Sequence, residues 1–195
     1  NPRLRAAIQS AKEANMPKGS ISRAISKSEI VGDRNYENLR YEGFGPFNSA
    51  LIIETLTDNK NRSASNIRTV LQKNGGRLGE TGSTSHLFNN CGVIHVEKSK
   101  LSEEDAFEIA TTVGAKDCLH IGDIHEIITE KEDFYKIKNQ LEKKIDSFSY
   151  FAIEWRAISG LKLDKEKTKK MIEVLNLLEE IDDVQNIFTN VILES

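Results

Sequence analysis

Three side chains between positions 118 and 125 have types and spacing that could bind a metal ion. Gly122-Asp123 predicts a two-residue turn between two strands, and glycine in its first position favours a type II′ turn. That turn would pair His120 with His125 and place Cys118 two residues along on the same face. One cysteine and two histidines can bind zinc, so a metal-binding protein or metal-dependent enzyme is one hypothesis. The alternative is that they are ordinary sheet-face residues, packed or solvated, with no fourth ligand nearby.

A second candidate site is a block of polar and basic residues between positions 60 and 77. A turn and cap cluster precedes a helix predicted at 62–73, whose N-terminus would offer free N–H donors to a phosphate. The alternative is an ordinary solvated helix face. The candidates for nucleic-acid contact are Lys60, Asn61, Arg62, Arg68, Lys73 and Arg77.

The first 31 residues form a third candidate site because their charge differs from that of the rest of the chain. They carry net charge +4, whereas the whole chain carries −3, so the remaining 164 residues carry −7. A basic head on an acidic body could direct the head toward phosphate. Two short helices with an ordinary solvated surface would give the same count. The cations are Arg3, Arg5, Lys12, Lys18, Arg23 and Lys27.

The sequence lacks the common motifs of enzymes and membrane proteins. The segment 75–79 has neither P-loop nor dinucleotide-binding spacing, and there is no Gly-x-Ser-x-Gly or His-Glu-x-x-His. We therefore expect no enzyme activity, no cofactor and no small-molecule substrate. No apolar run approaches the roughly 18 residues that cross a bilayer, which predicts no membrane partner. Two cysteines suggest reduced thiols in the cytoplasm.

These candidate residues must be positioned by a mixture of helices and strands. Apolar spacing predicts a helix at 2–14 and a second that ends before Gly32. Strands at 39–44 and 49–56 form a hairpin, and the helix at 62–73 follows. We expect two further short strands, 86–88 and 93–96, around a turn at Asn89-Asn90-Cys91-Gly92.

From Gly92 to Trp155 the predicted order is strand, helix, strand, strand, helix, strand, as in a ferredoxin-like fold. That unit is then complete. A long helix from Lys165 and a strand at 184–193 therefore have no place in it. We expect them to complete the sheet that contains the hairpin at 39–56, so that the ferredoxin-like unit is an insertion.

Five polar or glycine-rich segments stand out along the chain. They are Asn1-Pro2-Arg3-Leu4-Arg5, Asn15-Met16-Pro17-Lys18, Tyr41-Glu42-Gly43-Phe44-Gly45-Pro46, Thr57-Asp58-Asn59-Lys60-Asn61-Arg62 and Asp182-Asp183-Val184-Gln185-Asn186-Ile187-Phe188-Thr189-Asn190. In this order they resemble the YebC family of gene-expression regulators, which has a mitochondrial relative that activates translation of cytochrome c oxidase subunit I. The resemblance extends from the first residue to about Leu193. In many members the hairpin tip reads Pro-Gly-Gly, and here it reads Pro46-Phe47-Asn48.

The resemblance implies an α+β, YebC-like fold: an N-terminal helical domain at 1–32, a discontinuous α+β domain at 36–91 and 157–195, and an inserted ferredoxin-like domain at 92–156. It also implies a basic segment before Asn1. Its functional implication is a non-enzymatic, cytoplasmic regulator. Such a protein binds DNA at promoters, or associates with the ribosome and relieves stalling at proline-rich sequences. The implied partners are therefore DNA, ribosomal RNA or the ribosome.

Overall fold

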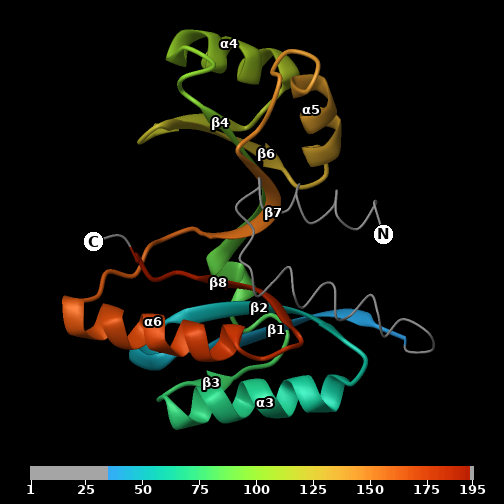
Figure 1. The fold of residues 1–195 in the computed structure, drawn as a ribbon. Helices are drawn as coiled ribbons and strands as arrows, with labels where there is room; N and C mark the ends of the chain where they lie inside the picture. Colours follow the sequence, from blue (N-terminus) through green and yellow to red (C-terminus); the bar gives the residue numbers. More distant parts are fainter. Residues whose placement is uncertain (1–34, 194–195) are drawn as a thin grey trace. The chain divides into compact units, whose positions relative to one another are not determined.

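The computed structural model describes residues 35–193, which form an α+β fold with two four-stranded sheets. The helices predicted within the first 31 residues lie outside the described part of the chain. The described residues divide into two compact units, one made of 35–89 and 155–193 and the other of 90–154. Figure 1 shows the order of the elements along the chain.

The first sheet has the strand order β3-β1-β2-β8. Its strands are β1 (Glu37–Phe44), β2 (Ala50–Thr57), β3 (Arg77–Leu78) and β8 (Val184–Thr189). The predicted hairpin is present: β1 and β2 are antiparallel and are joined by a short 3-10 turn, η1 (Pro46–Asn48). On its other edge β2 pairs antiparallel with β8. The expected pairing of the C-terminal strand with the earlier sheet is therefore confirmed.

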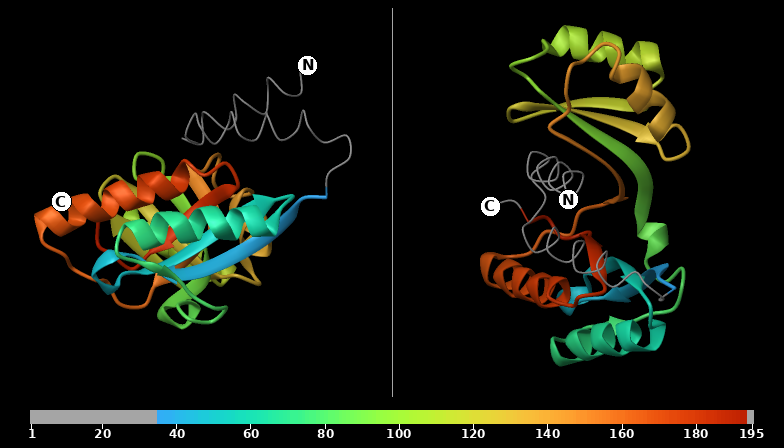
Figure 2. Two further views of the ribbon diagram at one scale, coloured as in Figure 1. Left: turned by 90° about the horizontal axis from the view of Figure 1, so that it is seen from below. Right: turned by 45° about the vertical axis from the view of Figure 1, so that its right-hand side comes forward.

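Two helices cover one face of this sheet, α3 (Lys60–Lys73) and α6 (Lys165–Glu179), as the left view of Figure 2 shows. Their buried side chains recur every three or four residues, as in Ile67 and Leu71 of α3, and they pack with Leu51 and Ile53 of β2 in one apolar core. A smaller cluster on Ala50, Ile52, Phe88, Trp155, Ala157 and Phe188 covers the second face. The two faces of β2 are therefore both buried, which explains its almost continuous apolar sequence.

The second sheet has the order β5-β6-β4-β7, which is the ferredoxin-like order. Figure 1 shows α4 and α5 beside this sheet, and their buried residues share a core with Ile94, Val96 and Ile127. Its elements are β4 (Phe88–Glu97), α4 (Glu103–Val113), β5 (Asp117–Ile121), β6 (Ile124–Glu130), α5 (Phe134–Leu141) and β7 (Tyr150–Ala157).

Local signals define the ends of these elements. Ser102 caps α4 by accepting a hydrogen bond from the backbone N–H of Asp105, which is the first half of the capping-box pattern. The Asp105 carboxylate accepts from the hydroxyl of Ser102 and not from its backbone N–H. Gly114 ends α4 in the left-handed conformation, and Gly122 takes a positive φ in the β5–β6 turn.

The expectation of two short strands around Asn89-Asn90-Cys91-Gly92 is wrong. β4 runs unbroken from Phe88 to Glu97, and residues 85–87 form a 3-10 turn, η2. The misleading signal was Gly92. A Cβ at this position would lie 2.4 Å from the ring of Phe134 and 2.3 Å from Oγ1 of Thr129. Glycine is therefore required there by close packing within a strand, and not by a turn.

We propose that the two compact units are separate folding domains, 36–91 with 157–195 and an inserted 92–156. Each unit has its own sheet and its own apolar core, which supports the division. Two resolved unfolding transitions in calorimetry would support this proposal, and one transition shared by both cores would contradict it.

Candidate nucleic-acid interface

The predicted basic helix starts at a well-defined cap. Asn59 accepts a hydrogen bond from the backbone N–H of Arg62 at 3.0 Å through its side-chain oxygen. The backbone N–H of Asn59 donates in turn to Oγ1 of Thr57 at 3.0 Å. The polar run that follows β2 is therefore a capping structure that fixes where α3 begins.

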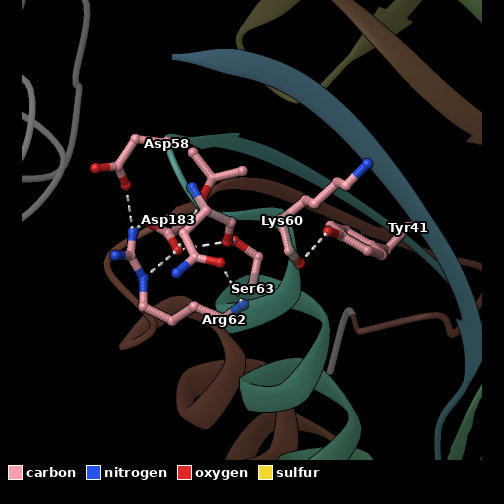
Figure 3. A network of polar contacts seen from close by, with 8 residues as sticks. Tyr41, Asp58, Lys60, Arg62, Ser63 and Asp183 are labelled. Atoms are coloured by element: carbon pink, nitrogen blue, oxygen red, sulfur yellow. Dashed lines mark hydrogen bonds and ion pairs between the residues drawn. The ribbon is translucent and has the colours of Figure 1, made fainter. Parts of the chain in front are cut away.

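Asp183, at the start of the C-terminal motif, is the centre of a hydrogen-bond network at this cap (Figure 3). Its carboxylate is almost fully buried, with 4% of the residue exposed. It accepts from Nε of Arg62 at 3.2 Å, from Nη2 at 2.9 Å, from Oγ of Ser63 at 2.7 Å and from Oγ1 of Thr57 at 3.2 Å. Nη2 of Arg62 also bonds Asp58 at 2.7 Å. The network thus ties the end of β2 and the start of α3 to the segment before β8.

The electrostatics of this network are those of an ion pair that stays ionised. Burial opposes the charge of Asp183, but hydrogen bonds from Arg62 and Ser63 outweigh it and hold the pKa of the carboxyl below its ordinary value. Hydrogen bonds to Asp183 and Asp58 raise the pKa of the Arg62 guanidinium. The carboxylates of Asp58 and Asp183 therefore lie beside the N-terminus of α3, where the sequence predicts a bound phosphate. The guanidinium of Arg62 is paired with these carboxylates.

The other candidates of this block remain at the surface. Lys60, Asn61, Arg68 and Lys73 are all exposed. Arg62 is exposed as well. At about 100° per residue, the six positions from Arg62 to Arg68 separate these two residues by about 120° around the helix axis. The guanidinium carbon of Arg77 lies 4.4 Å from the ring centroid of Phe44, so Arg77 stacks on β1 while its residue stays exposed.

The structure brings this block together on one helix and the adjacent β3. It does not test the basic head, because Arg3, Arg5, Lys12, Lys18, Arg23 and Lys27 lie outside the described residues.

The Tyr41–Pro46 motif also has a structural role in this unit. The hydroxyl of Tyr41 donates to the carbonyl of Lys60 at 3.0 Å, which attaches β1 to the first turn of α3. Burial, followed by the charge of Asp183, raises the pKa of this phenol. A Cβ at Gly43 would lie 2.8 Å from the carbonyl oxygen of Arg77, so the pairing of β1 with β3 requires glycine.

Glu42 of the same motif is a buried carboxylate, with 2% of the residue exposed. It accepts three backbone N–H bonds from the loop after β3, at 2.7 Å from Gly82, 3.1 Å from Thr84 and 2.6 Å from Ser85. Burial acts against its charge, but these hydrogen bonds hold its pKa below the ordinary value. The loop at 82–85 is thus ordered around one charge, a role that the local sequence around Glu42 does not reveal.

The hypothetical zinc site does not form. His120 does pair with His125 across the β5–β6 hairpin, as predicted, but their Nδ1 atoms are 2.7 Å apart and hydrogen-bond each other. Nε2 of His125 donates to the carbonyl of Leu101 at 2.7 Å, so both nitrogens of this ring are used within the protein. Burial raises the pKa of the Cys118 thiol, which disfavours the metal-binding thiolate. Within residues 35–193, no cluster of three or more ligand-type side chains could hold a metal ion.

The lowered pKa values of Asp183 and Glu42 predict that acid weakens the fold. A carboxyl whose pKa is lower in the folded state stabilises the fold above its unfolded pKa, and this stabilisation is lost as the pH falls through the folded pKa. We therefore expect the free energy of unfolding, measured with urea, to fall as the pH drops below about 4. An Asp183→Asn variant should show a shallower pH dependence than the parent chain. An equal slope in both would contradict this assignment.

Across the described residues, no helix has both the length and the apolar character needed to cross a bilayer.

Comparison with known proteins relates this arrangement to a family. Residues 36–191 match the model described as the TACO1/YebC second and third domain. A probable transcriptional regulatory protein of Pelagibacter ubique is 49% identical over 191 residues, which are 98% of this chain and 79% of that protein. A protein of the same description from Zymomonas mobilis is 44% identical over 191 residues, 97% of this chain and 76% of that protein.

A solved structure agrees with this assignment. The crystal structure of a conserved hypothetical protein from Aquifex aeolicus is similar with a TM-score of 0.76 and 40% sequence identity, and the match covers 100% of this chain and 81% of that one. The hairpin motif, the cap of α3 and the Asp183 segment all lie within the matched residues. The chain belongs to the TACO1/YebC family.

Proposed function

We propose that this protein is a non-enzymatic regulator of gene expression that acts by binding nucleic acid, with ribosomal RNA as its main target. The observation that carries the proposal is family membership over almost the whole described chain. As a family member at the ribosome, it would relieve stalling at proline-rich sequences in the cytoplasm. The second candidate is a promoter-binding protein, and the names of the two bacterial relatives favour it.

The structure supports a surface for phosphate contact on α3. The helix presents exposed cations, and the Asp183 network together with the Tyr41 hydroxyl fixes its first turn on the sheet. A charge on a rigid element loses little conformational entropy when it contacts a phosphate. We call the dispersed exposed cations Lys60, Arg68 and Lys73 the α3 surface; they are the part of the predicted block that is available for binding.

RNA on the ribosome is favoured over a DNA duplex by the geometry of α3. Base readout in the major groove needs several side chains on one helix face that reach base edges. On α3 the cations are distributed around the axis. Structured RNA instead offers dense phosphates and unpaired bases to a dispersed set of contacts.

Co-sedimentation with purified ribosomes tests this proposal. The variant Lys60→Glu, Arg68→Glu, Lys73→Glu should no longer associate at moderate salt, and the slope of log affinity against log salt should fall by about 0.7–0.9 for each phosphate that is no longer bound. Arg62 is left unchanged, because its replacement would disturb the Asp183 network as well as binding.

The matched control is Lys131→Glu, Lys136→Glu, Lys143→Glu, which makes the same change in net charge at three exposed lysines of the other unit. The control should bind as the parent does. If both variants associate equally weakly with ribosomes, binding depends on the net charge of the protein and not on the α3 surface. Tight binding to a promoter duplex with no ribosome association would favour the second candidate.

A further inference from the structure

The tip of the β1–β2 hairpin has a backbone conformation that its side chains do not favour. Phe47 has φ 63° and ψ 30°, and Asn48 has φ 57°. Both lie in the left-handed region, where L-residues with a Cβ are disfavoured and where glycine is the usual residue. Asparagine tolerates this conformation better than most residues, but phenylalanine does not. The chain therefore keeps an aromatic ring at a position that costs it stability.

Phe47 belongs to none of the three apolar clusters of the described residues, and 39% of its surface is exposed. The tip that holds it is nevertheless well braced. The N–H of Gly45 donates to the carbonyl of Ser49 at 2.9 Å, and the N–H of Ser49 donates to the carbonyl of Pro46 at 3.2 Å. Oγ of Ser49 lies 2.8 Å from the carbonyl of Pro46 and 3.4 Å from Sδ of Met171, which connects the tip to α6. An exposed aromatic ring is thus presented on a rigid loop.

One cation of α6 lies beside this ring, and a second lies one turn further along the helix. Nζ of Lys167 is 5.8 Å from the ring centroid of Phe47. One turn further along, Nζ of Lys170 bonds the side-chain oxygen of Asn74, just after α3, at 3.2 Å. Both lysines are about half exposed, and their contacts with Asp164 at 3.5 Å and with Glu173 at 4.0 Å are loose. Lysines in the first turns of a helix also oppose its dipole, so helix stability does not explain them.

We propose that Phe47, Lys167 and Lys170 form a binding site for one or two unpaired nucleotides, with a base stacked on Phe47 and the adjoining phosphates at the two lysines. Aromatic rings next to cations are the elements by which proteins bind single strands without reading their sequence. The fixed tip keeps the ring oriented before the ligand arrives, so binding restricts its freedom little further. The site rests on the proposed function, because it supplies a contact to unpaired nucleotides that the α3 surface lacks.

The test compares two variants that each place glycine at a left-handed position of the hairpin tip. Phe47→Gly removes the ring and relieves a left-handed residue, whereas Asn48→Gly relieves a left-handed residue and keeps the ring. Both should be at least as thermostable as the parent chain. Weaker binding in Phe47→Gly alone therefore cannot be due to unfolding. Lys167→Gln tests the cation beside the ring.

The measurement is the binding of the full chain to a 12-nucleotide RNA that contains 2-aminopurine. Binding is monitored by fluorescence anisotropy, and stacking by the quenching of the 2-aminopurine fluorescence. The same measurement is made with a single-stranded DNA of the same sequence and with the RNA duplex. Phe47→Gly should weaken binding to single strands roughly tenfold and abolish quenching, and Asn48→Gly should do neither. Preference for the RNA or the DNA strand identifies the source of the nucleotide.

Unchanged affinity and quenching in Phe47→Gly would overturn the site, and so would preference of the parent chain for the duplex. If the parent still sediments with ribosomes in that case, the proposed function stands and only the hairpin-tip site fails. If the parent binds neither ribosomes nor any nucleic acid, both proposals fail.

Discussion

Replacing Asp183 with asparagine is expected to lower the free energy of unfolding of the unit that contains the first sheet by about 2–4 kcal/mol. The change keeps the shape of the side chain but removes its charge. Nε of Arg62, Oγ of Ser63 and Oγ1 of Thr57 all donate to Oδ2, so the amide oxygen can take that place, and the N–H₂ group then replaces Oδ1, to which Nη2 of Arg62 donates. This N–H₂ group is a buried donor that faces another donor. The cost of an unsatisfied buried group, and not the Coulomb energy of an exposed pair, sets the size of the effect.

Urea denaturation at pH 7 measures this effect, and Asp182→Asn is its matched control. Asp182 is the neighbouring residue, carries the same charge and is exposed. Its replacement should change the unfolding free energy by less than about 0.5 kcal/mol. Equal stability of the two variants would contradict the role assigned to Asp183.

The second large effect is expected from Glu42→Gln. The amide can still accept the hydrogen bonds of one carboxylate oxygen, but its N–H₂ group would meet a backbone N–H of the loop at 82–85. Removing the charge and adding one clash between donors should cost about 2–3 kcal/mol. Because all three bonds lead to one loop, its amides should also exchange hydrogen faster than those of β1.

Hydrogen exchange read by NMR at Gly82, Thr84 and Ser85 checks this second effect locally. Glu80→Gln, an exposed position just before the loop, is the control and should leave the exchange unchanged. Protection that survives at all three amides in Glu42→Gln would show that the loop is ordered by something other than the carboxylate.

The sequence predicts the elements well because their signals are local. The capping box at Ser102, the turn at Gly122-Asp123 and the apolar spacing of α3 each depend on residues within one or two turns. The place of β8 followed from counting elements, since the ferredoxin-like order was already complete before α6. Gly92 was misread because glycine marks both turns and close packing, and only the position of Phe134 distinguishes them.

The candidate site was predicted less well because its contacts join distant parts of the chain. Arg62 and Asp183 are 121 positions apart, so the motifs that carry them gave no sign that they meet. The same holds for Lys167 beside Phe47. The exposed cations of α3 could be named from spacing. Which of them is engaged internally depends on the packing of α3 against the segment before β8.

The most direct test of the proposed function is ultraviolet crosslinking of the full-length protein in growing cells, followed by sequencing of the bound DNA and RNA. We predict that ribosomal RNA dominates, and that the yield falls in Lys60→Glu, Arg68→Glu, Lys73→Glu while the lysine control in the other unit keeps it. Crosslinks concentrated at a few promoters would contradict RNA as the main target. A yield no higher than that of a protein without nucleic-acid contacts would contradict nucleic-acid binding altogether.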